Sequence, residues 1–139
     1  AKIMETELIL RNEVSEISRL AAFVEGLGEE LNLSPDVVFN LNLALEEAVT
    51  NVVLYAYPQG QSGDISLTAS VHDNMIEFSL SDSGKAFDPT QMPDADVTLS
   101  ADERQIGGLG IFLIRQIMDD VRYERADGRN VLTLTKFIS

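Results

Sequence analysis

Glu47 and Asn51 are a carboxylate and a carboxamide that could act together on a ligand, because they lie four positions apart in a segment with helical periodicity. Residues at this spacing share one face of a helix, about one turn from each other. A carboxylate beside a carboxamide oxygen offers the hard oxygen ligands that magnesium prefers. The Glu47 carboxylate could instead orient or deprotonate a nucleophile. The pair follows one edge of the predicted buried stripe, although polar residues on a helix more often face solvent.

Asp82 stands at the end of an alternating segment and begins the sequence Asp82-Ser83-Gly84. It continues the apolar, even-numbered face of residues 76–80, so strand parity predicts a carboxylate that points inward. A buried carboxylate needs a hydrogen-bond donor, and an adenine amino group would serve. Gly84 would then let the backbone approach the base closely. The alternative is an ordinary turn that ends the strand.

The run Gly107-Gly108-Leu109-Gly110 immediately precedes a helical pattern. Glycines at a helix N-terminus expose backbone N–H groups to phosphate, and the helix dipole adds to the attraction. No Lys-Ser or Lys-Thr pair follows, so this is not a P-loop, and it is not a complete G-x-G-x-x-G fingerprint. It could also be a flexible hinge. Three such stretches in this order are less expected by chance than any one, and together they predict a pocket for ATP and magnesium.

Five strands and three helices are predicted to position these stretches, from the periodicity of the apolar residues. Ser34-Pro35-Asp36 combines an N-cap, a proline in the first turn and an acid near the positive helix end. The order of elements indicates an α+β fold, a two-layer α/β sandwich whose mostly antiparallel sheet is covered on one face by about three helices. The predicted strands are 3–10, 65–71, 76–81, 121–126 and 130–137, and the helices are 13–31, 34–55 and 110–119.

The segment 83–108 has no clear period and contains glycine, two prolines and several acids. It is longer than most connections in a compact domain, which predicts either a functional lid over the pocket or disorder. The whole chain of 139 residues is expected to form one domain, 1–139, around a single core.

The composition narrows the classes of function. The formal net charge of −13 at pH 7 repels phosphate backbones, which argues against a nucleic-acid partner. No apolar run approaches the ~20 residues that cross a bilayer, and no export signal is recognisable, so we expect no membrane association. The absence of cysteine excludes thiol chemistry and suits a cytoplasmic location.

The stretch Glu47-Ala48-Val49-Thr50-Asn51 resembles the N-box of the GHKL ATP-binding superfamily. Asp82-Ser83-Gly84 resembles the first glycine box of that superfamily, and Gly108-Leu109-Gly110 resembles the second. The small size, the nearly complete coverage of the chain and the ending Met118-Asp119-Asp120-Val121 look most like the anti-sigma-factor serine/threonine-protein kinases of bacterial partner-switching systems.

The resemblance implies a role for each matching position. Asn51 would ligate magnesium, and Glu47 would be the general base that activates the attacking hydroxyl. Asp82 would bind the adenine amino group, with Gly84 packed beneath the ring. The glycine run would hold the phosphates. The implied nucleotide-binding set is Asn51, Asp82, Gly84, Ala86, Gly107, Gly108, Leu109 and Gly110.

The resemblance also implies partners. The substrate would be a serine or threonine of an anti-anti-sigma (STAS-type) protein, and a sigma factor would be held inactive. Such kinases are typically homodimers.

Two departures from the family pattern bear on phosphoryl transfer. Ala86 stands where the first glycine box has its second glycine, and Ile106 precedes the glycine run where a lid arginine would be sought. Arg104 is the candidate to reach the terminal phosphate instead, with Lys85 as another. Three hypotheses follow: a kinase, a nucleotide-dependent trap for a regulator with little transfer, and an interaction domain without a nucleotide.

Overall fold

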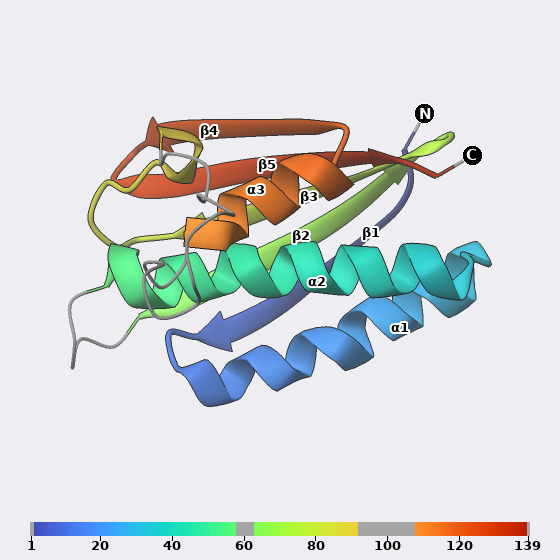
Figure 1. Ribbon diagram of the computed structural model, residues 1–139, viewed down its shortest axis with the longest axis horizontal. Helices are drawn as coiled ribbons and strands as arrows, with labels where there is room; N and C mark the ends of the chain where they lie inside the picture. Colours follow the sequence, from blue (N-terminus) through green and yellow to red (C-terminus); the bar gives the residue numbers. More distant parts are fainter. Residues whose placement is uncertain (1, 58–62, 92–107, 139) are drawn as a thin grey trace.

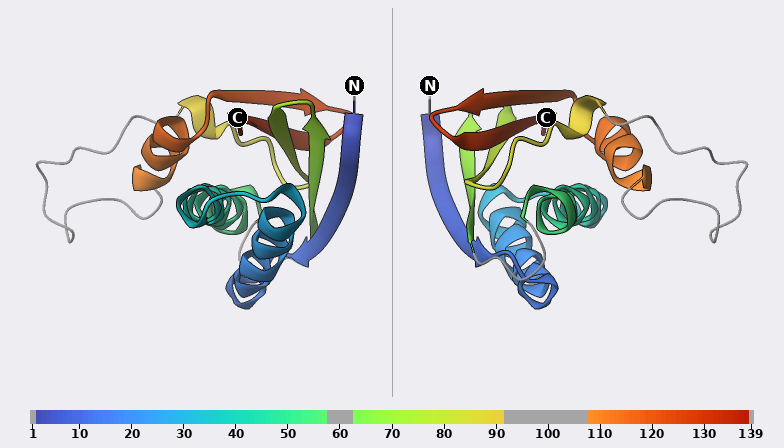
Figure 2. Two further views of the ribbon diagram at one scale, coloured as in Figure 1. Left: turned by 90° about the vertical axis from the view of Figure 1, so that its right-hand side faces the viewer. Right: turned by 90° about the vertical axis from the view of Figure 1, so that its left-hand side faces the viewer.

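The computed structural model describes residues 2–57, 63–91 and 108–138. In these parts the chain forms one antiparallel sheet with α1, α2 and α3 on the same side of it (Figures 1 and 2). The predicted α+β architecture with two layers is therefore confirmed. The strand order is β1-β2-β3-β5-β4, with β1 (Lys2–Arg11), β2 (Asp64–His72), β3 (Met75–Asp82), β4 (Asp120–Ala126) and β5 (Arg129–Phe137).

The central strands β2 and β3 have sequences in which apolar and polar residues alternate strictly. Along β2 and β3 every second residue is buried, because the helices cover only one face of an antiparallel sheet. The inward row of β3 ends in Asp82, as strand parity predicts. Asp82 lies opposite Ile65 of β2 and Asn130 of β5.

The helices begin and end close to the predicted positions, with local differences. Ser34 caps α2 (Pro35–Asn51) by accepting from the Val37 N–H at 3.3 Å. The predicted helix 13–31 is split into the 3₁₀ segment η1 (Val14–Ser18) and α1 (Arg19–Leu31). The Glu16 carboxylate accepts from the Arg11 N–H at 3.1 Å and so ties η1 back to β1.

The ends of α2 and α3 also differ from expectation. After Asn51 the helix widens into a π turn, η2 (Val52–Ala56). Such turns occur mostly as short irregularities and frequently at functional sites. The last helix, α3 (Gly108–Ile117), begins two residues before the predicted start, and its C-terminal end is earlier because β4 starts at Asp120.

The continuous helical stretch Pro35–Ala56 has 22 residues and contains an 18-residue window with a mean hydropathy of 1.4, so by length and composition alone it could cross a membrane. The expectation that no apolar run approaches this length concerned continuous runs. Glu46 and Glu47 lie in the middle of this stretch and interrupt its apolar residues, but its mean hydropathy stays high enough for a spanning helix. Buried core helices meet the same criteria, and Leu41, Ala44 and Leu45 are fully buried in the core of this fold.

Candidate functional site

Asn51 and Asp82 come together where the end of α2 faces the end of β3. Asn51 is 1% exposed and Asp82 is 1% exposed. Both line one cavity of about 10 Å³ between the helices and the sheet. The sequence-based alternative, in which Asn51 faces solvent, is wrong. The prediction that the Asp82 carboxylate points inward is confirmed.

The Asn51 carboxamide is buried without a partner. Neither its Oδ1 nor its Nδ2 makes a hydrogen bond to the described residues. An unsatisfied buried polar atom costs about 1–3 kcal/mol, and native structures contain few of them. A side chain held in this state at a cavity is positioned to bind a ligand or an ion.

The Asp82 carboxylate is partly satisfied by the protein. Its Oδ1 accepts from the Gly84 N–H and from Asn130 Nδ2, both at 2.9 Å. Among the described residues both hydrogen bonds of this carboxylate go to Oδ1, which leaves Oδ2 to accept from a ligand.

Asn130 is the organising residue that the sequence reasoning missed. Its Nδ2 donates to Asp82 and to the Lys85 carbonyl at 2.8 Å, while its Oδ1 accepts from the Phe87 N–H at 3.1 Å and from the Tyr123 hydroxyl. These partners use the full capacity of the amide and fix its orientation. Parity could have found it, because Asn130 lies on the inward face that Leu132 and Leu134 also occupy.

Gly84 lies against the protein's own backbone. A Cβ at this position would be 2.4 Å from the Ala56 carbonyl oxygen, to which the neighbouring Lys85 N–H donates at 2.8 Å. A glycine is therefore required here for contact between the strand end and η2. Packing of Gly84 beneath an adenine ring stays a prediction.

The segment after Gly84 closes the cavity. Phe87 lines it and stacks on Tyr55, with ring centroids 5.3 Å apart, and Pro89 at the start of η3 (Pro89–Gln91) lines it too. Ala86 is exposed. A cavity of about 10 Å³ holds one water at most, so a purine requires Phe87 to move.

Glu47 lies one turn before Asn51 on α2 and is half-buried. Burial raises the pKa of its carboxyl above 4.5, and the charge of the neighbouring Glu46 raises it further. A carboxylate with a raised pKa is a better proton acceptor. Glu47 does not itself line the small cavity.

Of the glycine run, only Gly108, Leu109 and Gly110 are among the described residues. Gly108, Leu109 and Gly110 form the first turn of α3, and α3 packs against α2 (Figure 1). The N–H groups at the start of a helix are available to an anion. Gly107, Arg104 and Ile106 lie outside the described residues, as does most of the predicted lid 83–108.

The site suits a magnesium ion that arrives with its nucleotide. The described residues contain no group of three or more His, Cys, Asp or Glu that could hold a metal. Magnesium usually keeps several waters and binds through one or two protein oxygens together with substrate phosphates. The unpartnered Oδ1 of Asn51 fits that arrangement.

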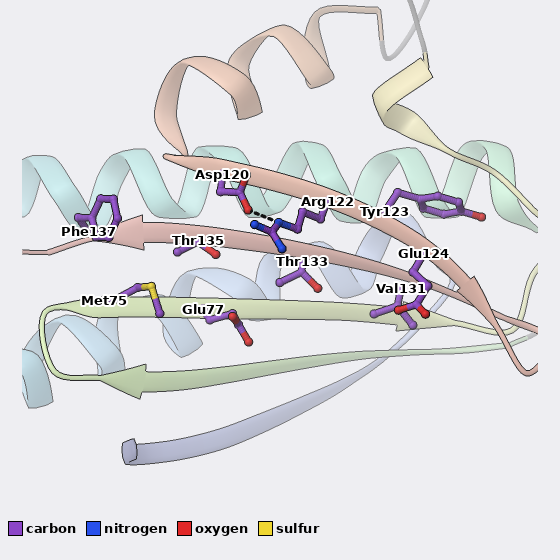
Figure 3. Close-up of a pocket in the computed structure, with 10 residues that line it drawn as sticks. All are labelled: Met75, Glu77, Asp120, Arg122, Tyr123, Glu124, Val131, Thr133, Thr135 and Phe137. Atoms are coloured by element: carbon purple, nitrogen blue, oxygen red, sulfur yellow. Dashed lines mark hydrogen bonds and ion pairs between the residues drawn. The ribbon is translucent and has the colours of Figure 1, made fainter. Parts of the chain in front are cut away.

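A larger cavity of about 800 Å³ lies on the outer face of β3, β5 and β4 (Figure 3). None of the predicted site residues lines it. Its lining includes the Arg122–Asp120 ion pair at 2.6 Å, which is largely exposed. We therefore place the candidate site at the smaller cavity, where the buried unpartnered amide lies.

Comparisons with known proteins show the family to which the chain belongs. The family model described as a histidine kinase-like ATPase domain matches residues 10–136. The serine-protein kinase RsbW of Listeria monocytogenes is 31% identical over 96% of this chain and 85% of its own length. The serine/threonine-protein kinase BtrW of Bordetella bronchiseptica is 38% identical over 70% of this chain and 68% of its own.

Solved structures share the fold. The RsbU and RsbW domains of a Mycobacterium tuberculosis protein superpose with a TM-score of 0.70 at 17% identity, over 98% of this chain and 33% of that chain. The histidine kinase domain of a blue-light-activated kinase from Erythrobacter litoralis gives a TM-score of 0.57 at 13% identity, over 90% of this chain and 60% of that chain.

Proposed function

The chain belongs to the family of histidine kinase-like ATPase domains, and from this we propose that it is an ATP- and magnesium-dependent serine/threonine-protein kinase. The carrying observation is the buried Asn51 carboxamide, which has no hydrogen-bond partner among the described residues and lines the same cavity as Asp82. The proposed metal ligand and the proposed base-recognition group therefore line one cavity, although they come from elements far apart in the sequence.

Each residue has a distinct role in the proposal. Asn51 Oδ1 holds magnesium, which neutralises phosphate charge when it is bound. Asp82 Oδ2 accepts from the adenine amino group, while Gly84 and Ala86 border the base. The N–H groups of the run from Gly107, through Gly108 and Leu109, to Gly110 hold the phosphates.

Phosphoryl transfer needs a base and a positive charge near the terminal phosphate. Glu47, whose pKa is raised by burial and by Glu46, accepts the proton of the attacking hydroxyl. Arg104 supplies positive charge to the terminal phosphate.

The proposed partners follow from relatives named serine-protein kinase RsbW. The substrate is a serine or threonine of an anti-anti-sigma protein of the STAS type. The second partner is a sigma factor, which the kinase sequesters. The kinase acts as a homodimer in the cytoplasm.

Substitution of Asn51 tests the proposal. Asn51→Ala removes the only amide of the cavity that has no partner among the described residues. We expect ATP binding in the presence of magnesium, measured by calorimetry, to weaken by about tenfold or more, which is ~1.4 kcal/mol. Asn42→Ala, on the same helix but outside the cavity, is the control. Equal binding by wild type and Asn51→Ala would overturn the assignment of the site.

Transfer is measured separately with radiolabelled ATP and a STAS-type partner. Label on a serine or threonine of the partner supports the kinase. Its absence, with ATP still bound, overturns the kinase and leaves the nucleotide-binding module.

A nucleotide-dependent trap is the second candidate, because Phe87 occupies the site. The ring stacks on Tyr55, and the remaining cavity is about 10 Å³. Ala86 in place of a glycine stiffens this segment, and Ile106 stands where an arginine would be expected. Formation of a stable complex with a sigma factor that depends on ATP, without labelled partner, favours the trap.

A further inference from the structure

The strand β1 is ten residues long and lies at one edge of the sheet. An edge strand presents a row of backbone N–H and C=O groups that its neighbour does not pair. Among the described residues, η3 lies against β4 at the opposite edge and η1 lies against β1. Figure 2 shows β1 along the margin of the molecule.

Side chains from η1 and α1 cover the C-terminal half of this edge. Arg19 Nη1 donates to the Ile9 carbonyl at 3.0 Å, and the Arg11 N–H donates to Glu16. Backbone groups of alternate residues point to the same side of a strand, so those of Glu7 also face outward. Among the described residues no hydrogen bond reaches the backbone of Glu7. Side chains therefore cover the edge at Ile9 and Arg11, whereas at Glu7 the described residues leave it uncovered.

A groove of about 430 Å³ lies between β1 and α1, next to Glu7 in the sequence of β1. Its apolar lining includes Met4 and Phe23, which pack on the core with part of their surface uncovered, and the buried Leu27. Gly26 has no side chain to fill it, and an added Cβ would meet nothing within 4 Å.

The acidic side chains at the groove favour a positively charged ligand. Glu30 and Glu5 line the groove, and among the described residues no lysine or arginine does. The Glu5 carboxylate also accepts from Ser70 Oγ at 3.1 Å, so Glu30 is the main charge offered to a ligand. The whole chain carries a formal net charge of −13, so the edge of a second copy would bring glutamates against glutamates. Like charges placed together at an interface cost several kcal/mol, whereas opposite charges steer partners to each other.

We propose that the groove between β1 and α1 binds an extended, positively charged segment of a partner protein. The segment adds a strand to β1 at Glu7, places an apolar side chain against Met4, Phe23 and Leu27, and sets a basic side chain beside Glu30. This is recognition by β-strand addition, in which backbone hydrogen bonds give affinity and the flanking pocket gives specificity. The surface is distinct from the nucleotide site, which lies between α2, β3 and β5.

A fluorescent peptide of alternating lysine and leucine serves as the probe, with its binding to the full chain measured by anisotropy. The same peptide with N-methyl groups on alternate amides cannot pair with an edge. We expect it to bind at least about tenfold more weakly. The amide of Glu7 should become protected from hydrogen exchange only with the unmethylated peptide.

Gly26→Leu fills the groove from an exposed helix position and should reduce probe binding by about tenfold or more. Glu30→Lys is a second variant, which reverses a charge at the groove without adding an apolar side chain, and it should have the same effect. Glu29→Lys is the matched control, because Glu29 is an exposed residue of α1 that does not line the groove and the charge change is the same. Unchanged ATP binding in all three shows that the fold is intact.

Three results would overturn the proposal. Equal binding of methylated and unmethylated peptides would show attraction by charge alone. Full probe binding by both Gly26→Leu and Glu30→Lys would place the peptide elsewhere. Self-association of the wild type, seen by analytical ultracentrifugation and lost in Gly26→Leu, would assign the groove to a second copy of the chain.

Discussion

At the scale of single residues, Glu47 links catalysis to stability. Its raised pKa, caused by burial and then by Glu46, means that the folded state holds its proton more tightly than the unfolded state does. Its contribution to stability is therefore greatest below the unfolded value of 4.5 and is lost as pH rises through the raised pKa. We predict that Glu47→Gln melts at a higher temperature than wild type at neutral pH. The difference in melting temperature should disappear below pH 4.5, where Glu47 is protonated in both the folded and the unfolded state.

The same variant separates binding from transfer. Glu47→Gln should keep ATP binding and lose phosphoryl transfer, because an amide cannot accept the hydroxyl proton. Glu46→Gln is the matched control. It removes the second cause of the raised pKa, so transfer should persist and the acidic limb of its pH profile should move to lower pH. Transfer by Glu47→Gln at the wild-type rate contradicts the role of Glu47 as base.

Asn130 fixes the carboxylate that we assign to adenine. Asn130→Asp places a carboxylate where an amide now donates to Asp82 Oδ1 at 2.9 Å. Two carboxylates this close share a proton. We predict that ATP affinity of the variant falls as pH rises, when that proton is lost, while the affinity of wild type changes little over the same range. Isothermal titration across pH measures this effect.

Asn130→Ser is the control for this titration, because it loses the amide without adding a charge. Its affinity should be lower at every pH and show no added pH dependence. A pH-independent affinity in Asn130→Asp, equal to that of wild type, would be incompatible with coupling between position 130 and Asp82.

At the scale of elements, the contact of Gly84 with η2 is a steric requirement. A Cβ at Gly84 would be 2.4 Å from a backbone oxygen of Ala56, which cannot move without shifting the π turn. Gly84→Ala should therefore destabilise the fold by about 1–3 kcal/mol. Gly26→Ala is the matched control, because its Cβ meets nothing within 4 Å and alanine favours a helix interior by about 1 kcal/mol. Urea unfolding compares the two, and equal stability of the variants would contradict the steric argument.

The strands were predictable from sequence because their side-chain period is two and only one face is buried. The parity that placed residues 76–80 inward also placed Asp82. The 3₁₀ segment η1 and the π turn η2 were not predictable. Over five residues their side-chain spacing differs little from that of an α-helix, and hydrogen bonds from distant residues determine which form is adopted.

The site was only half predictable for a similar reason. Asn51 and Asp82 stand in motifs, whereas Asn130 and Phe87 act through contacts that join β5 to the segment after β3. Register between distant strands determines these contacts. The sequence showed that Asp82 needed a donor, but it did not show that Asn130 supplies one.

At the scale of the whole molecule, the net charge of −13 opposes the approach of a polyanion. Repulsion between exposed charges is screened over about 10 Å at 0.1 M salt, so it acts on the rate at which ATP reaches the site. We predict that without magnesium the association rate of ATP, measured by stopped flow, rises with added NaCl, and that with magnesium the rise is smaller. Adenosine, which has no phosphates, is the matched ligand, and its rate should not depend on salt. Identical salt dependence for ATP and adenosine would mean that the glycine run and α3 shield the phosphates from the molecule's overall field.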